Sequence, residues 1–241
     1  MKMYKTDLHI HTCLSPCADL DMSPKYIIRE AKEKGIDIVG ICDHNSGENV
    51  LAVERHAANQ GGDVNVIGGL EITSNEEVHI LALFENEESL FAMQKIVYDN
   101  LPGINNEKRF GEQVVVNEND EVMGFNKKLL IGTTELSIED IVNFIHQLDG
   151  LAIASHIDRE TYSIIHQLGF IPQRLQLDAV EVSTADKIKD FKNISLPVIT
   201  SSDAHTIKHI GRSFTWFFME KPNLEEIKKS LLGTNGRKVI V

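Results

Sequence analysis

Six of the ten histidines in this 241-residue chain lie at the ends of short apolar runs, close to acidic residues. His9 and His11 stand two residues apart in the run KTDLHIHT. The corresponding residues of the other runs are Asp43 with His44, Glu71, His79, His156, and Asp203 with His205. Imidazole and carboxylate groups bind divalent transition metals, and a cluster of such ions activates water. The pattern therefore predicts a metal centre with hydrolytic chemistry.

Each of these motifs is weak evidence by itself, because any two histidines can fall two apart on a strand. The combination is stronger. Separate strand ends offer imidazole and carboxylate groups to one region, and burying such groups without partners would be costly. A metal centre explains the whole set better than a hydrogen-bonded polar core does.

Alternating strand and helix patterns must position these groups. The predicted strands are 5–11, 37–43, 64–72, 78–84, 151–156, 179–183, 197–202 and 214–219, and the predicted helices are 24–34, 49–60, 87–99, 138–148, 160–168 and 224–232. Several strands are continuous Val, Ile and Leu runs, which is typical of strands covered on both faces. The alternation predicts a mainly parallel sheet, and the carboxyl ends of barrel strands meet at one rim. We therefore expect an α/β barrel with the polar cluster on that rim.

Residues 101–135 interrupt this rhythm. The segment QVVVNENDEVMGFNKKLLIG predicts two short strands around the polar turn at 117–120. We expect a hairpin insertion, so that residues 1–241 form one domain, as the chain length allows.

Composition and charge exclude several classes of function. The formal net charge of −12 argues against broad binding to DNA, RNA or anionic membranes, although bound cations would leave a phosphorylated substrate open. Three cysteines, an odd number, favour a reduced cytoplasmic protein over a disulfide framework. No run suggests a signal peptide or approaches the roughly 20 apolar residues of a membrane span. The chain also lacks the nucleophile elbow of serine hydrolases and the phosphate loop of P-loop NTPases.

The order of the motifs resembles that of the PHP family, named for the polymerase and histidinol phosphatase proteins that share it. The matching segments are Asp7-Leu8-His9-Ile10-His11, Asp43-His44, Glu71 with His79, His156, and Ser202-Asp203-Ala204-His205 followed by Ile210-Gly211. The resemblance implies a distorted (β/α)7 TIM-like barrel with two or three divalent ions (Zn, Mn or Fe) at the carboxyl rim. It also implies phosphoesterase activity.

The resemblance assigns the polar groups to three ions, with Glu71 bridging the first two. The implied sets are His9, His11, Glu71 and Asp203 for one ion, Glu71, His79 and His156 for the second, and His44 with His205 for the third. Members of the family usually supply a further ligand after the His-x-His motif. Cys17 is the first candidate here and Asp19 is its rival. A thiolate from Cys17 would favour a softer metal such as zinc or iron.

Two cationic residues are candidates for binding phosphate. Arg159 follows His156 by three residues and could clamp a phosphate, or it could form a surface ion pair with Glu160 or Asp158. Lys208 is a weaker candidate of the same kind.

Several other polar residues have more than one interpretation. Asp7 could orient His9, or it could simply begin the strand. Asp43 could be a ligand, a proton carrier or a hydrogen-bonding support of the rim. The remaining candidates are expected to have structural roles. We expect His56, His146 and His166 to be ordinary helix residues, and Cys42 to be a small buried residue.

These features together predict a metal-dependent phosphoesterase. A metal-bridging hydroxide near Glu71 would attack a small phosphomonoester, a nucleotide or a short oligonucleotide, and Asp43 and Arg159 would complete the catalytic set. Long duplex nucleic acid and membranes are not expected partners. The alternatives are a metal-dependent amidohydrolase and a non-catalytic metal-binding module.

Overall fold

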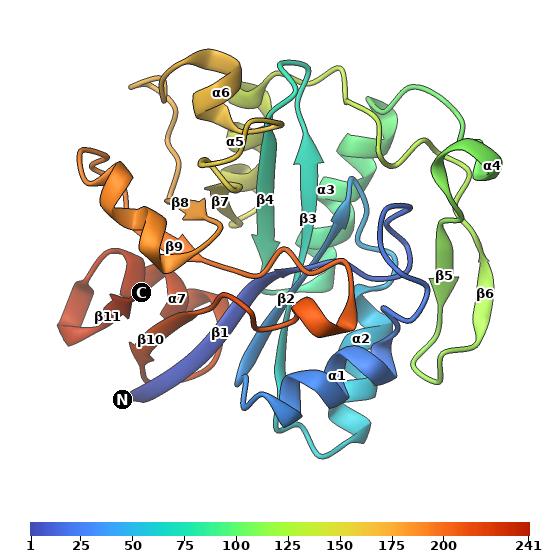
Figure 1. Ribbon diagram of the computed structural model, residues 1–241, viewed down its shortest axis with the longest axis horizontal. Coiled ribbons are helices and arrows are strands. Elements are labelled where there is room, and N and C mark those ends of the chain that lie inside the picture. The colour runs from blue at the N-terminus through green and yellow to red at the C-terminus, as the bar shows by residue number, and fades with distance from the viewer.

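The computed structural model describes all residues from 1 to 241. Its main element is a nine-stranded sheet with the order β11-β10-β1-β2-β3-β4-β7-β8-β9 (Figure 1). The strands are β1 (Lys2–Ile10), β2 (Ile38–His44), β3 (Asn65–Thr73), β4 (His79–Phe84), β7 (Leu151–Ala154), β8 (Ala179–Val182), β9 (Val198–Thr200), β10 (Thr215–Met219) and β11 (Lys238–Ile240). Eight of these correspond to predicted strands, and β11 was not predicted.

The sheet curls into a nearly closed barrel. Just beyond β9, Ala204 accepts a backbone hydrogen bond from His11 at 3.0 Å and donates one to His9 at 3.2 Å. One apolar cluster, which includes Leu8, Leu81 and Ile153, fills the interior of the barrel, and a larger cluster lies between the sheet and the helices. Strands buried on both faces explain the continuous apolar runs. The predicted α/β barrel is therefore confirmed.

Helices cover the outside of the barrel. They are α1 (Pro24–Glu33), α2 (Val50–Asn59), α3 (Glu87–Asp99), α4 (Glu107–Phe110), α5 (Ile138–Gln147), α6 (Ile164–Leu168) and α7 (Leu224–Leu231), with 3-10 turns η1 (Ala185–Phe191), η2 (Ile207–His209) and η3 (Thr234–Gly236). The helix expected from residue 160 begins only at Ile164, because residues 156–163 form a loop over the rim. None of the helices is both long and apolar enough to cross a bilayer.

The sheet is mixed, which corrects the expectation of a mainly parallel one. Strands β1, β2 and β3 are parallel, as are β7, β8 and β9, but β4 runs antiparallel to both of its neighbours. The turn between β3 and β4 is too short for a parallel crossover, which needs a dozen or more residues. Because β4 runs in the opposite direction, His79 at its start lies on the same rim as the end of β3.

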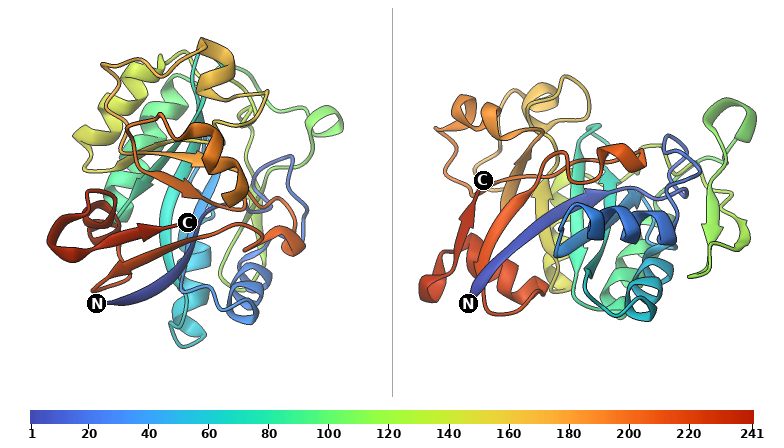
Figure 2. Two further views of the ribbon diagram at one scale, coloured as in Figure 1. Left: turned by 60° about the vertical axis from the view of Figure 1, so that its left-hand side comes forward. Right: turned by 60° about the horizontal axis from the view of Figure 1, so that its bottom comes forward.

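Residues 101–135 contain a two-stranded hairpin, formed by β5 (Val114–Val116) and β6 (Val122–Phe125). It projects from the side of the barrel opposite β10 and β11 (Figures 1 and 2). Asn49 ties it to the rim, since its side chain donates to Val114 O at 3.0 Å and accepts from Val116 N at 3.0 Å.

A glycine in β2 permits an irregularity in β1 beside the first histidine motif. The register of β1 against β2 shifts between Asp7 and Ile10, so β1 carries an extra residue there. A Cβ atom at Gly40 would lie 2.7 Å from Leu8 Cα, which is too close for any side chain. Glycine at position 40 therefore allows the bulged part of β1, which carries His9, to approach β2.

Gly40→Ala is expected to lower the free energy of unfolding by about 3 kcal/mol, because overpacking against backbone has no flexible neighbour to relieve it. Thermal and urea unfolding measure the loss. Gly124→Ala is the matched control, since a Cβ there meets nothing within 4 Å. Equal stability of the two variants would contradict this account of the bulge.

Candidate metal centre

The rim of the barrel gathers the six histidines and two of the carboxylates that the sequence singled out. Three groups have ligand atoms within 4.8 Å of one another, and these groups are His9, His11, Glu71 and Asp203; His44, Glu71 and His79; and His11, His44 and His205. His156 joins them through its Nε2, which lies 3.1 Å from Glu71 Oε1. The groups come from β1, β2, β3, β4 and the segments that follow β7 and β9.

Glu71 is at the centre of this cluster. Its Oε1 lies 2.9 Å from His79 Nδ1 and 3.1 Å from His156 Nε2. Its Oε2 lies 3.1 Å from His44 Nδ1 and 3.4 Å from His11 Nε2. A carboxylate surrounded by imidazoles on both oxygens has the geometry of a bridging ligand.

Glu181 of β8 is a site residue that the sequence analysis missed. It is fully buried, and its Oε1 lies 3.2 Å from His9 Nδ1 and 3.2 Å from the backbone N of His156. A carboxylate accepts hydrogen bonds only, so His9 carries its proton on Nδ1. The one signal in the sequence was an acidic residue within the apolar run AVEV, which otherwise forms a buried strand.

A second hydrogen-bonded chain holds His11. Ser15 Oγ lies 2.7 Å from Asp43 Oδ1 and 2.9 Å from His11 Nδ1. The serine hydroxyl must donate to the carboxylate, so it accepts from His11, which therefore carries its proton on Nδ1. In neutral rings, the Nε2 atoms of His9 and His11 are then both free of protons.

These residues fit a bound cation. The two bare Nε2 atoms lie 3.1 Å apart, where their lone pairs would repel each other unless a positive charge lay beside them. Two nitrogen ligands of one tetrahedral zinc ion, each about 2.0–2.1 Å from the metal, have a similar separation. His44 Nδ1 and Asp203 Oδ1 are also buried without a hydrogen-bond partner, as expected of atoms that face a metal.

Burial and the ion pairs within the cluster together set the charge states of its groups. Burial raises the pKa of the Glu71 carboxyl, but the facing His79 and His9 outweigh burial and hold that pKa well below its usual range. Burial also raises the pKa of Asp203, and His9 with His11 again reverses the effect. Burial lowers the pKa of His79 to about 4 and of His205 to about 3. Burial also lowers the pKa of His9 and His11, but Glu71 and Asp203 outweigh burial, so the pKa of His9 lies well above its usual range and that of His11 rises to about 9. A metal ion bound there would displace their protons.

Backbone strain is concentrated at the same rim. His156 has φ 27° and Asp203 has φ 46°, in the left-handed region that residues with a side chain avoid. Such conformations cost of order 1–3 kcal/mol each and gather at functional sites. The positive φ also shows that Asp203 does not continue β9 in extended form.

A pocket of about 170 Å³ opens onto the cluster. Its walls are His44, Glu71, His79, Ile131, His156, Arg159, Thr161, Tyr162, Asp203 and His205. The Arg159 guanidinium reaches into this pocket and hydrogen-bonds the Asp203 carboxylate. Asp158 bonds instead to Lys187 at 2.7 Å, so the alternative in which Arg159 pairs with Asp158 is wrong.

Four of the other candidates lie outside the pocket. Both oxygens of Asp43 are occupied by Thr12 and Ser15, at 2.7 Å in each case. Cys17 and Asp19 are both exposed. The Lys208 side chain is exposed on η2 and is not part of the pocket wall.

Asp7 does not orient His9, contrary to one of the two interpretations. Its carboxylate accepts hydrogen bonds from Ser202 N at 2.9 Å and from Gly211 N at 2.8 Å. The bulge between Asp7 and Ile10 breaks the two-residue alternation that would have put Asp7 and His9 on one face. Asp7 therefore anchors the segment that carries Asp203.

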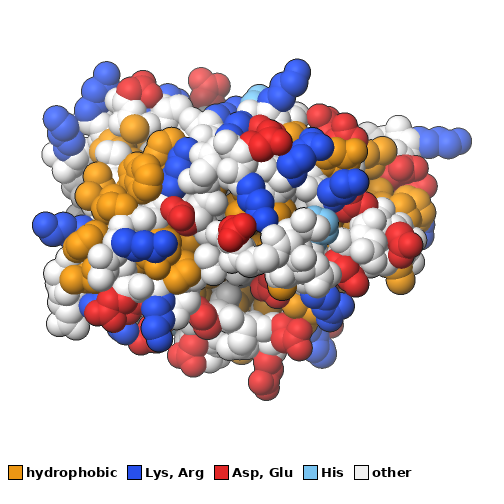
Figure 3. Space-filling model, turned by 90° about the horizontal axis from the view of Figure 1, so that it is seen from below, with side chains coloured by type: hydrophobic (Ala, Val, Ile, Leu, Met, Phe, Trp, Pro, Cys, Tyr) orange, Lys and Arg blue, Asp and Glu red, His pale blue; other side chains and the backbone are white.

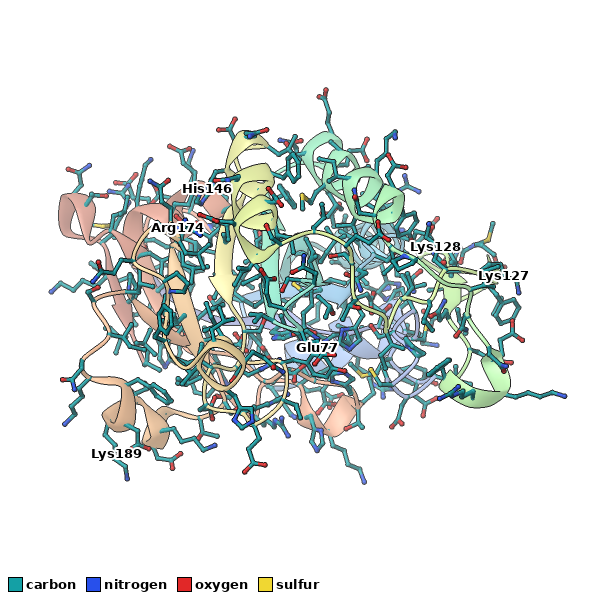
Figure 4. All side chains as sticks on the ribbon, turned by 90° about the horizontal axis from the view of Figure 1, so that it is seen from above. Glu77, Lys127, Lys128, His146, Arg174 and Lys189 are labelled. Carbon is teal, nitrogen blue, oxygen red and sulfur yellow. The ribbon has the colours of Figure 1, made fainter.

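His56, His146 and His166 are helix residues, as predicted. His56 lies on α2, His166 on α6, and His146 on α5 at the periphery of the molecule, where it pairs with Asp178 at 3.0 Å (Figure 4). Cys42 is fully buried among apolar side chains.

Solved structures of similar fold include nucleic-acid enzymes. PfuEndoQ, a lesion-specific endonuclease from Pyrococcus furiosus, matches 99% of this chain and 58% of its own with a TM-score of 0.75 and 21% identity. Endonuclease Q in complex with a 27-mer duplex that carries an abasic lesion matches 98% of this chain and 58% of its own, with a TM-score of 0.72 and 22% identity. A protein from Bifidobacterium adolescentis assigned as a metal-dependent phosphoesterase matches 94% of this chain and 95% of its own, with a TM-score of 0.60 and 16% identity. These likenesses show a shared fold.

Curated relatives match parts of the chain. Uncharacterized protein MJ1587 from Methanocaldococcus jannaschii is 37% identical over 92 residues, which are 35% of this chain and 52% of that protein. A 5'-3' exoribonuclease from Haemophilus influenzae is 32% identical over 82 residues, which are 33% of this chain and 28% of that enzyme. The chain thus spans about half the length of MJ1587 and of PfuEndoQ.

Family models account for the rim motifs. The model described as PHP-associated matches residues 191–233, which contain Asp203 and His205. The model described as PHP domain matches residues 7–162, which contain the other six groups of the cluster. Since that second match covers well over half of the sequence, the chain belongs to the PHP domain family.

Proposed function

We propose that this protein is a metal-dependent phosphoesterase that hydrolyses a small phosphomonoester, a nucleotide or a short oligonucleotide. The observation that carries the proposal is the position of Arg159, whose guanidinium shares one small pocket with the imidazole and carboxylate cluster. Arginine offers a fork of donors that matches phosphate oxygens, whereas an amide substrate would have less need of such a group.

The proposed ligand sets follow from the groups that lie together. His9, His11, Glu71 and Asp203 would hold one ion; Glu71, His79 and His156 a second; and His11, His44 and His205, with Cys17 near His44, a third. When bound, these ions would lower the pKa of a water towards about 7 and neutralise charge on the phosphoryl oxygens.

The residues of the chain itself have distinct roles in this proposal. Arg159 binds the phosphate, and its bond to Asp203 fixes the guanidinium at the pocket wall. Asp43 is a positioning residue, which acts on His11 through Ser15. Lys208 has no place in the proposed site.

Duplex DNA is a second candidate substrate, favoured by the fold shared with the lesion-bound endonuclease Q. The charge of the chain favours short substrates instead. The net charge is −12, and acidic and basic side chains are interspersed on the face seen from below (Figure 3). A basic stripe would serve a long duplex better.

The test is turnover by protein loaded with Mn²⁺ or Zn²⁺. The substrates are p-nitrophenyl phosphate, nucleotides, 5'-phosphorylated oligonucleotides and a duplex with an abasic site. We expect hydrolysis of at least one short substrate and inhibition by inorganic phosphate. Fully metal-loaded protein that hydrolyses none of them would refute the proposal, and cleavage of the duplex alone would favour the second candidate.

Arg159→Lys is expected to weaken phosphate binding, because an ammonium cannot form the two parallel hydrogen bonds of a guanidinium. KM for a phosphomonoester should rise about tenfold or more, while metal content stays at the wild-type level. Steady-state kinetics with elemental analysis measure both. Arg174→Lys, at an exposed ion pair with Glu139, is the matched control. An unchanged KM in Arg159→Lys would remove Arg159 from the site.

A further inference from the structure

Two side chains give the pocket an apolar component. Of the ten residues that form its walls, eight are charged or polar and only Ile131 and Tyr162 are hydrophobic. Ile131 comes from the insertion and Tyr162 from the loop between β7 and α6. The Ile131 side chain has no polar atom and the face of the Tyr162 ring is apolar, so both offer apolar area to whatever part of a ligand adjoins the phosphate.

Asn45 holds the backbone of Ile131 in place. Its side-chain amide nitrogen donates to Leu130 O and to Gly132 O, both at 2.8 Å, and thus grips the carbonyls on either side of Ile131. Its Oδ1 accepts from Thr73 N at 3.1 Å, at the end of β3. Asn45 is buried and has φ 53°, a strained conformation that Asn tolerates better than most residues. One side chain next to His44 therefore fixes the insertion against the metal rim.

Tyr162 is held just as firmly. Its carbonyl accepts from His79 N at 2.9 Å, and its φ is 56°. The phenol ring stacks on the His79 imidazole with centroids 4.4 Å apart and planes 16° apart. Tyr162 nevertheless keeps 37% of its surface exposed, so part of it is available to a ligand.

We propose that Ile131 and Tyr162 form an apolar collar at the pocket and that Asn45 holds this collar in position. The collar selects phosphate ligands that carry a planar, apolar ring next to the phosphate over ligands that carry a short alkyl group or a polyol there. The inference rests on the proposed function for the phosphate end of the ligand. A ring presents flat apolar area to both residues, whereas a polyol would have to give up hydrogen bonds to water next to them.

Binding of two phosphonates tests the collar without requiring turnover. Phenylphosphonate and methylphosphonate present the same anion, and only the first carries a ring. Calorimetry on Mn²⁺-loaded wild-type protein is expected to show phenylphosphonate binding about tenfold more tightly or better. Equal affinities, or no binding of either phosphonate, would overturn the collar. Turnover of glycerol phosphate without preference for phenyl phosphate would overturn it too, while leaving the phosphoesterase function intact.

Three variants locate the preference in the named residues. Ile131→Ala and Tyr162→Ala should each reduce the ratio of the two affinities to about threefold or less. Metal content is measured for each variant, and the ratios are compared at full metal loading. Asn45→Asp keeps the acceptor for Thr73 N and the tolerance of positive φ, but it loses both donors to the insertion. We therefore expect Asn45→Asp to reduce the ratio of the two affinities as much as Ile131→Ala does. A wild-type ratio in the two alanine variants would overturn the proposal, and a wild-type ratio in Asn45→Asp alone would remove Asn45 from it.

Discussion

Glu71→Gln should abolish most of the activity, with kcat on a phosphomonoester reduced by about 10³-fold or more. Glutamine has nearly the same shape as glutamate but lacks its charge, and its amide group would present protons to imidazole nitrogens that should face metal. Because Glu71 contacts five histidines, the loss should affect more than one ion. Charge stabilisation by the ions is worth several kcal/mol, and each 1.36 kcal/mol corresponds to about a factor of ten in rate.

Elemental analysis and steady-state kinetics check this expectation together. Glu226→Gln is the matched control, since Glu226 is also buried but pairs with Arg237 at 2.7 Å, outside the pocket. That control should lose stability and keep its metal. Full metal content and near wild-type kcat in Glu71→Gln would show that Glu71 does not bridge ions.

Glu181→Ala should weaken metal binding by about 10–100-fold, the usual cost of removing a group that orients a histidine ligand. Without Glu181, His9 is free to rotate and to carry its proton on Nε2, the nitrogen that faces His11 at 3.1 Å. The backbone N of His156 also loses its acceptor. Competition with a chelator measures the dissociation constants for Zn²⁺ and Mn²⁺.

Glu181→Gln distinguishes a loss of His9 orientation from a general loss of the fold. The glutamine oxygen can still accept from His9 Nδ1, so most of the affinity should return. If the alanine variant binds metal as tightly as the wild type, or if glutamine fails to restore binding to a well-folded protein, the role assigned to Glu181 is wrong.

Local sequence patterns predicted most strands of the barrel and many of the polar residues at its rim. Continuous apolar runs marked the strands covered on both faces, and polar residues at their ends marked the rim. The predicted helix 138–148 was also correct, since α5 spans Ile138–Gln147. Such features depend on residues a few positions apart, and the periodicity of one element reports which of its faces is buried.

Longer-range relations needed the tertiary structure. The direction of β4 follows from the short turn before it, and the apolar run of β4 reads the same in either direction. Glu181 lies 172 residues from the histidine that it orients. The grip of Asn45 on the carbonyls around Ile131 likewise joins segments about 85 residues apart.

The amino-acid sequence alone thus determined the kind of chemistry, because metal ligands are recognisable by residue type and by their position at strand ends. Only the tertiary structure decided which groups lie together on the rim, which nitrogen of His9 and of His11 faces an oxygen partner, and which apolar residues line the pocket. The physical reason is that these properties depend on distances of about 3 Å between side chains from different strands, and strand order, bulges and loop anchors set those distances.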